Sequence, residues 1–275
     1  MLAVVLVGGF GTRLQPLTYD VPHPLLPVGH RPMIVGLVER LAPAGITDVV
    51  LALGFKPEPF EQAFRDGRCG DVRIHYAVEP EPLDTGGAIA FAARHVGVDG
   101  TFVVANGDII TDLDLGALVR AHHRLGTAAP IHLTPVDDPS AFGVVEVGDD
   151  GIVTRFVEKP EPGETESNLI NAGTYVLEPS VLDLIPDGAR RSVERDVFPV
   201  LSREGRLGAC ATDDYWIDAG RPEPYLRANL DLASGRRDSV VAALDQGARV
   251  ADTATVRDAV VGEGESVASG ATVEE

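Results

Sequence analysis

The chain has 275 residues, of which 44% are hydrophobic, which is enough for one sizeable α/β domain and a small appendage. Its formal net charge of −19 argues against a nucleic acid or an anionic membrane surface as a partner. It has two cysteines and no apolar stretch of membrane-spanning length, a composition typical of a cytoplasmic protein without disulfide bonds.

The first 110 residues alternate short apolar runs with amphipathic segments. We expect strands at 2–7, 48–53, 72–78 and 101–105, and helices at 32–44, 58–65 and 85–95. Apolar strands separated by helices predict an α/β fold with a doubly wound, mostly parallel sheet. Ligands of such sheets bind beyond the carboxyl ends of the strands, so the segments 8–13 and 106–108 should reach one crevice.

The remaining chain changes character twice. Residues 128–178 are richer in strand patterns, such as 144–147 and 174–177, and would supply an acceptor-binding half. Residues 180–234 return to helix and strand patterns, with a helical spacing of apolar residues at 225–232. The adjacent histidines His122 and His123 are expected on the solvated surface of a helix.

The tail carries a valine repeat at positions 250, 256, 261, 267 and 273. This spacing is typical of the hexapeptide repeats of a left-handed β-helix, of which about one and a half coils could form. We therefore predict two domains, 1–235 and 236–275. Because so short a β-helix exposes apolar ends, it is expected to pack on a partner subunit in a homo-oligomer, most simply a dimer.

A glycine-rich loop with the sequence GGFGTR follows the first expected strand, at residues 8–13. Without Cβ atoms, its backbone N–H groups can close around a phosphate chain, and Arg13 adds a permanent fork-shaped charge. The loop is not a dinucleotide fingerprint, because Leu14 stands where the third glycine belongs, and it lacks the lysine of a P-loop. It predicts a nucleotide-phosphate site.

This loop and several later motifs resemble those of the sugar-1-phosphate nucleotidylyltransferases, most nearly the mannose-1-phosphate guanylyltransferase branch. The matching segments are 8–28, 31–34, 79–88, 106–108, 142–144, 157–160, 170–173, 192–199 and 216–220. The resemblance covers residues 1–235. It implies a Rossmann-like nucleotidyltransferase fold that transfers a nucleoside monophosphate from a nucleoside triphosphate, first of all GTP, to a sugar 1-phosphate, first of all mannose 1-phosphate. The products would be a nucleoside diphosphate sugar and pyrophosphate.

The resemblance also implies roles for individual residues. The implied nucleotide-binding residues are Gly8, Gly9, Gly11, Thr12, Arg13, Glu79, Thr85 and Gly86, with backbone groups at 85–87 reading the base. The implied sugar-phosphate residues are Gly143, Glu158, Lys159 and Asn171. The implied catalytic residues are Arg13, His23, Asp108 and Lys159.

Two acids are the expected ligands of a Mg²⁺ cofactor. Asp108 lies just past an expected strand in a tight Asn-Gly-Asp turn, and Asp218 lies between an apolar run and Gly220. Such carboxylates suit Mg²⁺, which retains several waters. The two acids are far apart in the sequence, so only the fold can bring them together.

His23 departs from the family pattern, which has a lysine between two prolines at this position. A protonated imidazole could serve as a shorter cationic substitute. Alternatively the site is tuned to another acceptor, such as heptose, glucose or a cyclitol like valienol 1-phosphate, or the chain is a regulatory subunit that binds a nucleotide sugar without making it. The other expected functional residues are present, which favours an active enzyme.

Overall fold

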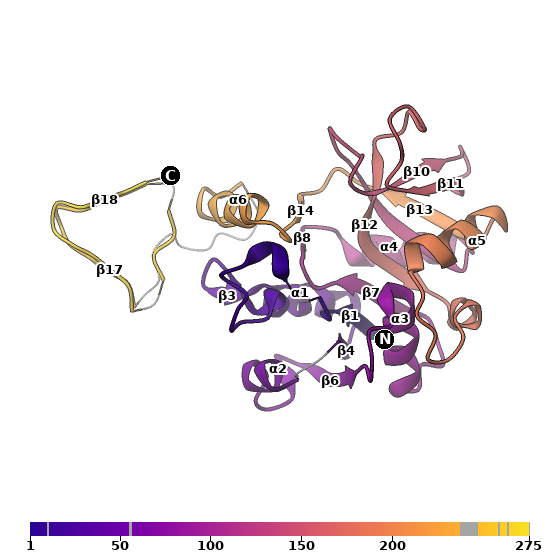
Figure 1. Ribbon diagram of the computed structural model, residues 1–275, viewed down its shortest axis with the longest axis horizontal. Helices are drawn as coiled ribbons and strands as arrows, with labels where there is room; N and C mark the ends of the chain where they lie inside the picture. Colours follow the sequence, from indigo (N-terminus) through magenta and orange to yellow (C-terminus); the bar gives the residue numbers. More distant parts are fainter. Residues whose placement is uncertain (10, 55–56, 237–246, 258, 263, 275) are drawn as a thin grey trace.

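The computed structural model describes residues 1–9, 11–54, 57–236, 247–257, 259–262 and 264–274. Within these residues, a ten-stranded mixed sheet has the order β11-β10-β12-β7-β1-β4-β6-β5, with β9 beside β12 and β13 beside β9 (Figure 1). The strands of the sheet are β1 (Leu2–Leu6), β4 (Asp48–Leu53), β5 (Arg68–Cys69), β6 (Val72–Val78), β7 (Phe102–Asn106), β9 (Ala129–Pro135), β10 (Gly143–Val147), β11 (Val153–Glu158), β12 (Leu169–Leu177) and β13 (Leu207–Ala211).

The shorter strands and the helices connect and cover this sheet. The α-helices are α1 (Met33–Leu41), α2 (Glu58–Ala63), α3 (Asp84–His95), α4 (Leu115–Leu125), α5 (Phe198–Arg203) and α6 (Pro222–Ala233). Two short antiparallel pairs are formed by β2 (Pro27–Val28) with β3 (Arg31–Pro32) and by β8 (Ile109–Thr111) with β14 (Trp216–Asp218).

The half of the sheet around β1 is parallel and covered on both faces. Strands β7, β1, β4 and β6 are parallel neighbours. Successive residues of β1 enter opposite cores, since Val4 packs in the cluster that contains the buried face of α3 and Val5 in the cluster that contains α1 and α2. Burial on both faces explains why these strands read as continuous apolar runs. The predicted doubly wound, mostly parallel fold class is confirmed.

The other half of the sheet is mixed, because β12 runs antiparallel to β7, β9 and β10. β12 starts at Leu169, five residues before the strand predicted at 174–177. Its pairing with β9 shifts between Asn171 and Tyr175, around Gly173 at φ +77°. A bulge with a positive-φ glycine and a polar residue interrupts the apolar pattern, so the sequence shows only the second part of this strand.

His122 contradicts the expectation of a solvated histidine pair. Helix α4 packs on β9 and β12, and His122 is 6% exposed, with Nε2 2.6 Å from Glu178 Oε1. His123 is exposed. The prediction was therefore wrong for His122, whose face of the helix turns toward the sheet.

The tail forms one described turn of a coil beyond α6 (Figure 1). β15 (Arg249–Val250) pairs in parallel with β17 (Ser266–Val267), and β16 (Thr255–Val256) pairs in parallel with β18 (Thr272–Val273). Valines of the predicted repeat face each other in both pairs, Val250 with Val267 and Val256 with Val273. Residues 237–246, the first part of the predicted tail, lie outside the described residues.

Among the described residues, no helix has both the length and the apolar character needed to cross a membrane. Both cysteines, Cys69 and Cys210, are free thiols and half-buried.

Candidate active site

A cavity of about 320 Å³ opens at the carboxyl ends of β1, β4, β6 and β7. The glycine loop and the segment after β7 both reach it, as the strand pattern predicts. Its lining comprises Leu6, Val7, Gly8, Gly9, His23, Pro24, Ala52, Gly54, Glu79, Pro82, Asp84, Thr85, Ala88, Asn106 and Asp108.

The glycine loop leaves open space where side chains would stand. A Cβ on Gly9 would meet nothing within 4 Å among the described atoms, so this residue opens onto the cavity. Gly11 has a φ of +61°, which side-chain-bearing residues rarely adopt, and its carbonyl accepts a hydrogen bond from Thr18 Oγ1 at 2.7 Å. Gly11, Thr12 and Arg13 come after the cavity-lining glycines in the sequence and do not line the cavity themselves. The loop can hold a phosphate chain through its backbone at the cavity and through Arg13 beyond it.

The fold brings Asp108 and Asp218 together through the short β8–β14 pair. Asp218 lies opposite Ile109 in this pair, and the Ala219 N–H donates to the Asp108 carbonyl oxygen at 3.0 Å. A Cβ on Gly220 would lie 2.8 Å from Asp218 Oδ1 and 2.9 Å from Arg13 Nη2. Gly220 therefore leaves room for the predicted metal ligand and the predicted phosphate-binding arginine to meet.

The charges around Asp108 suit a cation. Burial raises the pKa of Asp108, and the nearby charge of Asp218 raises it further, while His23 and Arg13 act in the opposite direction. Next to it, the Oδ1 atom of Asn106 is buried with no hydrogen-bond partner in the described part of the chain. Two facing carboxylates and an unpartnered amide oxygen are hard oxygen donors, which fit a divalent cation such as Mg²⁺.

The protein alone would not complete such a metal site. No group of three or more His, Cys, Asp or Glu side chains within the described ranges is placed to hold a metal. Mg²⁺ is commonly bound by one or two carboxylates together with substrate phosphates and waters. The Asp108–Asp218 pair fits that mode of binding.

His23 connects the proline-rich segment at residues 22–27 to the residue that follows β14. Its side chain is 7% exposed, and its Nε2 lies 3.1 Å from the Ala219 carbonyl oxygen. Because a carbonyl oxygen only accepts, Nε2 carries the hydrogen and donates it. The ring nitrogen left for other partners is Nδ1.

Glu79 and Thr85 form the wall beyond β6. Glu79 is buried, its Oε2 accepts the Leu83 N–H at 2.9 Å, and burial raises the pKa of its carboxyl. Thr85 Oγ1 donates to Glu194 Oε2 at 2.6 Å and accepts the Val193 N–H at 2.9 Å. This wall is thus braced by a segment more than 100 residues away.

The backbone N–H of Gly86, one of the groups expected to read the base, is hydrogen-bonded within the protein. Gly86 does not line the cavity, and its N–H donates to the Arg191 carbonyl oxygen at 2.8 Å. A Cβ on Gly86 would lie 3.0 Å from that oxygen and from the Val193 nitrogen. Gly86 instead allows the first turn of α3 to approach the 191–193 backbone closely.

The four predicted sugar-phosphate residues lie on β10, β11 and β12 or just after them, outside the 320 Å³ cavity. Gly143 pairs with Glu158, and a Cβ on Gly143 would lie 3.0 Å from Glu158 Oε2. Lys159 has a φ of +53°, and its Nζ lies 3.7 Å from Glu158 Oε1. Asn171 donates from Nδ2 to the Tyr175 hydroxyl at 3.0 Å and accepts the Gly173 N–H at 3.1 Å.

Electrostatic interactions act between Glu158 and residues nearer the cavity. Burial raises the pKa of Tyr175, and the charges of Glu194, Glu158 and Asp108 contribute to the increase. Burial, and then the charge of Glu194, likewise raises the pKa of Glu158. Glu158, expected on the sugar side, and Asp108, a candidate metal ligand, thus both raise the pKa of one buried tyrosine.

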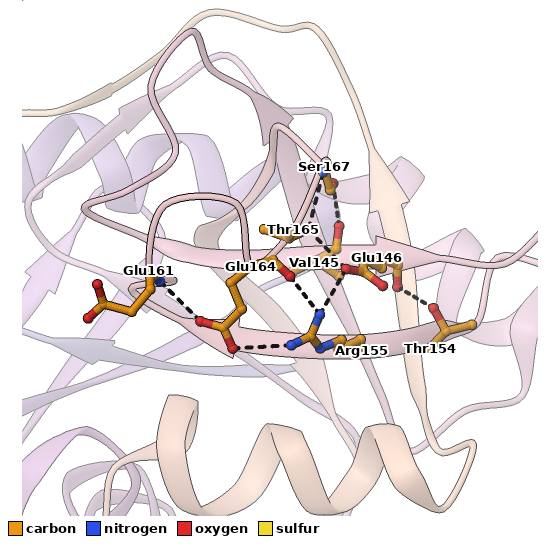
Figure 2. A network of polar contacts seen from close by, with 8 residues as sticks. All are labelled: Val145, Glu146, Thr154, Arg155, Glu161, Glu164, Thr165 and Ser167. Carbon is orange, nitrogen blue, oxygen red and sulfur yellow. Dashed lines mark hydrogen bonds and ion pairs between the residues drawn. The ribbon is translucent and has the colours of Figure 1, made fainter.

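The loop after Lys159 is fixed to β10 and β11 by a polar network (Figure 2). Arg155 donates to the Glu164 carbonyl oxygen at 2.9 Å and to its Oε1 at 3.1 Å. Thr165 Oγ1 donates to Glu146 Oε1 at 2.9 Å, and Ser167 Oγ donates to the Val145 carbonyl oxygen at 2.7 Å. Exposed contacts of this kind each contribute little stability, but together they order the loop that leads from the sugar-side residues to β12.

Helix α6 anchors both the His23 segment and β14, a role that the sequence analysis missed. Tyr225 donates its hydroxyl to the Pro27 carbonyl oxygen at 2.5 Å, and Asn229 Oδ1 accepts the Gly29 N–H at 2.9 Å. On the β14 side, the Tyr215 hydroxyl donates to Asp231 Oδ2 at 3.2 Å. No local pattern indicates these contacts, because the Tyr225 and Asn229 contacts join residues about 200 positions apart.

The sheet, the glycine loop and the neighbouring acids together define an α/β protein whose cavity fits a nucleotide phosphate and a divalent cation. The family model described as nucleotidyl transferase matches residues 2–235. The chain belongs to the nucleotidyl transferase family.

Among the relatives, a mannose-1-phosphate guanylyltransferase of Mycobacterium tuberculosis is 43% identical over 235 residues, covering 85% of this chain and 65% of that protein. A probable mannose-1-phosphate guanylyltransferase 1 of Oryza sativa is 40% identical over 271 residues, covering 96% of this chain and 74% of that protein. The solved structure of HddC from Yersinia pseudotuberculosis complexed with GMP-PN has a TM-score of 0.69 and 30% identity, covering 83% of this chain and 97% of that chain. The chain spans just under two thirds of the length of the Mycobacterium relative.

Proposed function

We propose that the protein transfers GMP from GTP to mannose 1-phosphate, giving GDP-mannose and pyrophosphate. The observation that carries the proposal is that the β8–β14 pair and the hydrogen bond from the Ala219 N–H to the Asp108 carbonyl oxygen bring Asp108 and Asp218 together beside the glycine loop. Relatives named for this activity support the two substrates, and a structural relative in complex with GMP-PN supports a guanine nucleotide.

In this reaction an oxygen of the sugar phosphate attacks the α-phosphorus of GTP and pyrophosphate leaves. The task of the protein is to position two anions and to neutralise their charge. The backbone of Gly8 and Gly9 would hold the triphosphate, and Arg13 would stabilise the departing pyrophosphate. Asp108 and Asp218 would hold Mg²⁺, which supplies Lewis-acid stabilisation of the phosphoryl oxygens.

The sugar phosphate would bind on the acceptor side. Lys159 would pair with its phosphate, while Glu158 and Asn171 would bind sugar hydroxyls near the bare backbone of Gly143. The half-buried carboxylate of Glu158 and the remaining Nδ2 hydrogen of Asn171 support this placement. It leaves the α-phosphorus between the two halves of the site.

We further propose residues 1–235 as the nucleotidyltransferase domain and 236–275 as a hexapeptide-repeat-like tail of a cytoplasmic homodimer. The described coil supports this assignment, because valines of the repeat pair in it, Val250 with Val267 and Val256 with Val273. A second copy would pack against this short coil. Light scattering before and after deletion of residues beyond 240 tests the dimer, and a monomer in both cases would refute it.

The activity is tested by measuring pyrophosphate release from five nucleoside triphosphates against mannose, glucose, heptose and valienol 1-phosphates with Mg²⁺. The proposal expects one strongly preferred pair, GTP with mannose 1-phosphate, and loss of turnover in excess chelator. A different preferred pair would keep the reaction class and replace the substrates. Full activity in chelator would refute the metal.

One observation favours a second candidate, a binding subunit without turnover. His23 already donates its Nε2 hydrogen to the Ala219 carbonyl oxygen, so that hydrogen is not free for a phosphate. A His23→Lys variant separates the two candidates. Turnover by the wild-type protein supports the enzyme, whereas turnover by the variant alone supports the binding subunit.

A further inference from the structure

Asp84 stands in an unusual backbone conformation on the wall of the cavity. Its φ is +62°, and within the described chain it shares a positive φ with one other non-glycine residue, Lys159. This left-handed region favours glycine, although aspartate tolerates it better than most residues do. A side chain kept at a position that suits glycine suggests that the carboxylate has a use in the site.

The contacts of Asp84 leave part of its carboxylate available to a ligand. Oδ1 accepts the Thr85 N–H at 2.8 Å, and Oδ2 has no partner in the described residues. The side chain is exposed and belongs to the cavity lining. A ligand in the cavity therefore meets a carboxylate oxygen that only accepts hydrogen bonds.

Glu79 supplies a second acceptor on the same wall. It is 8% exposed, and its Oε2 accepts the Leu83 N–H, while Oε1 has no partner in the described part of the chain. Burial raises the pKa of Glu79, and no cation among the described residues opposes this effect. A buried carboxylate without a cation is costly unless a ligand donates to it.

The order of the strands shows which part of a nucleotide reaches this wall. Asp108 follows β7 and the glycine loop follows β1, whereas Glu79 follows β6, three strands away from β7. Three strand spacings amount to about 14 Å. A nucleotide with its phosphates at the glycine loop and the candidate metal ligands extends its base toward Glu79 and Asp84.

We propose that Asp84, together with Glu79, selects guanine among the nucleobases, so that Asp84 is a specificity-determining residue. Guanine presents an N1–H and a 2-amino group side by side, two adjacent donors for acceptors that cannot donate. Uracil and thymine flank their single N3–H with carbonyl oxygens, which carboxylates repel. Adenine and cytosine present an amino group beside an unprotonated ring nitrogen. The inference rests on the proposed function, because it requires that the cavity bind a nucleoside triphosphate.

The test is calorimetric binding of GTP, ITP, UTP and ATP with Mg²⁺, without acceptor, to the full chain and its variants. Wild-type protein should prefer GTP, and ITP should bind more weakly because it lacks the 2-amino group. In Asp84→Gly the GTP-to-UTP affinity ratio should fall by about tenfold or more. Its melting temperature should hold or rise, because glycine adopts this φ without strain.

Two further variants separate base selection from general effects. Asp84→Asn tolerates the left-handed backbone but adds N–H donors, and it should also lose preference for GTP. Glu81→Gln removes a neighbouring exposed acid outside the cavity lining and should leave the ratio unchanged.

An unchanged ratio in Asp84→Gly, equal weakening of all four nucleotides, an equal fall of the ratio in Glu81→Gln, or a wild-type preference for another base would each overturn the inference. In the first three cases triphosphate binding persists and the proposed function survives, whereas a wild-type preference for another base would keep only the reaction class. Failure of the wild-type protein to bind any triphosphate would overturn both.

Discussion

Gly143→Ala is expected to damage the acceptor side of the site selectively. The new Cβ would lie 2.6 Å from Phe156 Cζ and 3.0 Å from Glu158 Oε2, both closer than an ordinary contact. Phe156 cannot easily retreat, because its ring packs 5.4 Å from that of Phe198, which packs 5.0 Å from Tyr175. Such overpacking costs about 1–3 kcal/mol. In a domain of this size each kcal/mol lowers the melting temperature by about 2–4 °C.

The same overlap displaces Glu158 from the place beside the sugar that we propose for it. Loss of one charge-assisted hydrogen bond costs about 1.5–3 kcal/mol, so KM for the sugar phosphate should rise roughly 10- to 100-fold. KM for GTP should stay within about twofold, because the described atoms nearest a Cβ on Gly143 belong to Phe156 and Glu158, which do not line the cavity proposed for the nucleotide.

Steady-state kinetics with each substrate varied, together with thermal unfolding, measures both effects. Gly36→Ala is the matched control: it lies inside α1, a Cβ there meets nothing within 4 Å, and its φ is not positive. It should raise stability by about 0.5–1 kcal/mol and leave both KM values unchanged. If Gly143→Ala raised KM for GTP as much as KM for the sugar phosphate, the placement of the acceptor beside Gly143 would be refuted.

Three other variants probe the metal pair, a buried histidine and α6. Asp218→Asn should lower kcat/KM by about a hundredfold or more and move the Mg²⁺ dependence to higher concentration, and an unchanged Mg²⁺ titration would argue against a ligand role. Burial lowers the pKa of His132 from 6.5 to about 4, so stability that is present above pH 6.5 is lost as the pH falls toward 4, by at most about 3 kcal/mol. His132→Gln can keep a hydrogen bond to Thr212 and should lose less stability between pH 7.5 and pH 4.5 in urea unfolding; equal losses would contradict the buried neutral imidazole. Asn229→Ala leaves the Gly29 N–H unpaired and should cost about 1–3 kcal/mol, whereas Asn229→Asp, which keeps the acceptor, should cost less by the same measurement.

The parallel half of the fold was predictable because its strands are buried on both faces. Strand β4 has the predicted bounds, β6 has them too, and β1 ends one residue earlier. In such strands every residue faces a core and is therefore apolar, so the apolar run in the sequence shows where each strand begins and ends. Helix α1 also ends as expected, with a short turn that reaches Gly45 at φ +83°.

The features that were missed depend on contacts between distant residues. The burial of His122 depends on Glu178, 56 residues further along the chain, and the packing role of Gly86 depends on the carbonyl of Arg191. For Asp108 and Asp218, the sequence analysis predicted a shared site, but only the β8–β14 pair makes them neighbours. Their chemical role, like that of Lys159 and Arg13, stays a prediction for the experiments above.

The hydrogen bonds between the first turn of α3 and the 191–194 segment determine when the domain can finish folding during synthesis. Gly86 and Gly87 donate to the Arg191 carbonyl oxygen, and the Arg191 N–H donates to the Leu83 carbonyl oxygen. A nascent chain that has emerged only as far as β7 therefore has its glycine loop, but the cavity wall beyond β6 lacks its support. At typical elongation rates the missing segment leaves the ribosome several seconds later. The proposed nucleotide ligand can therefore stabilise only the nearly complete domain, because a ligand stabilises only the state that binds it.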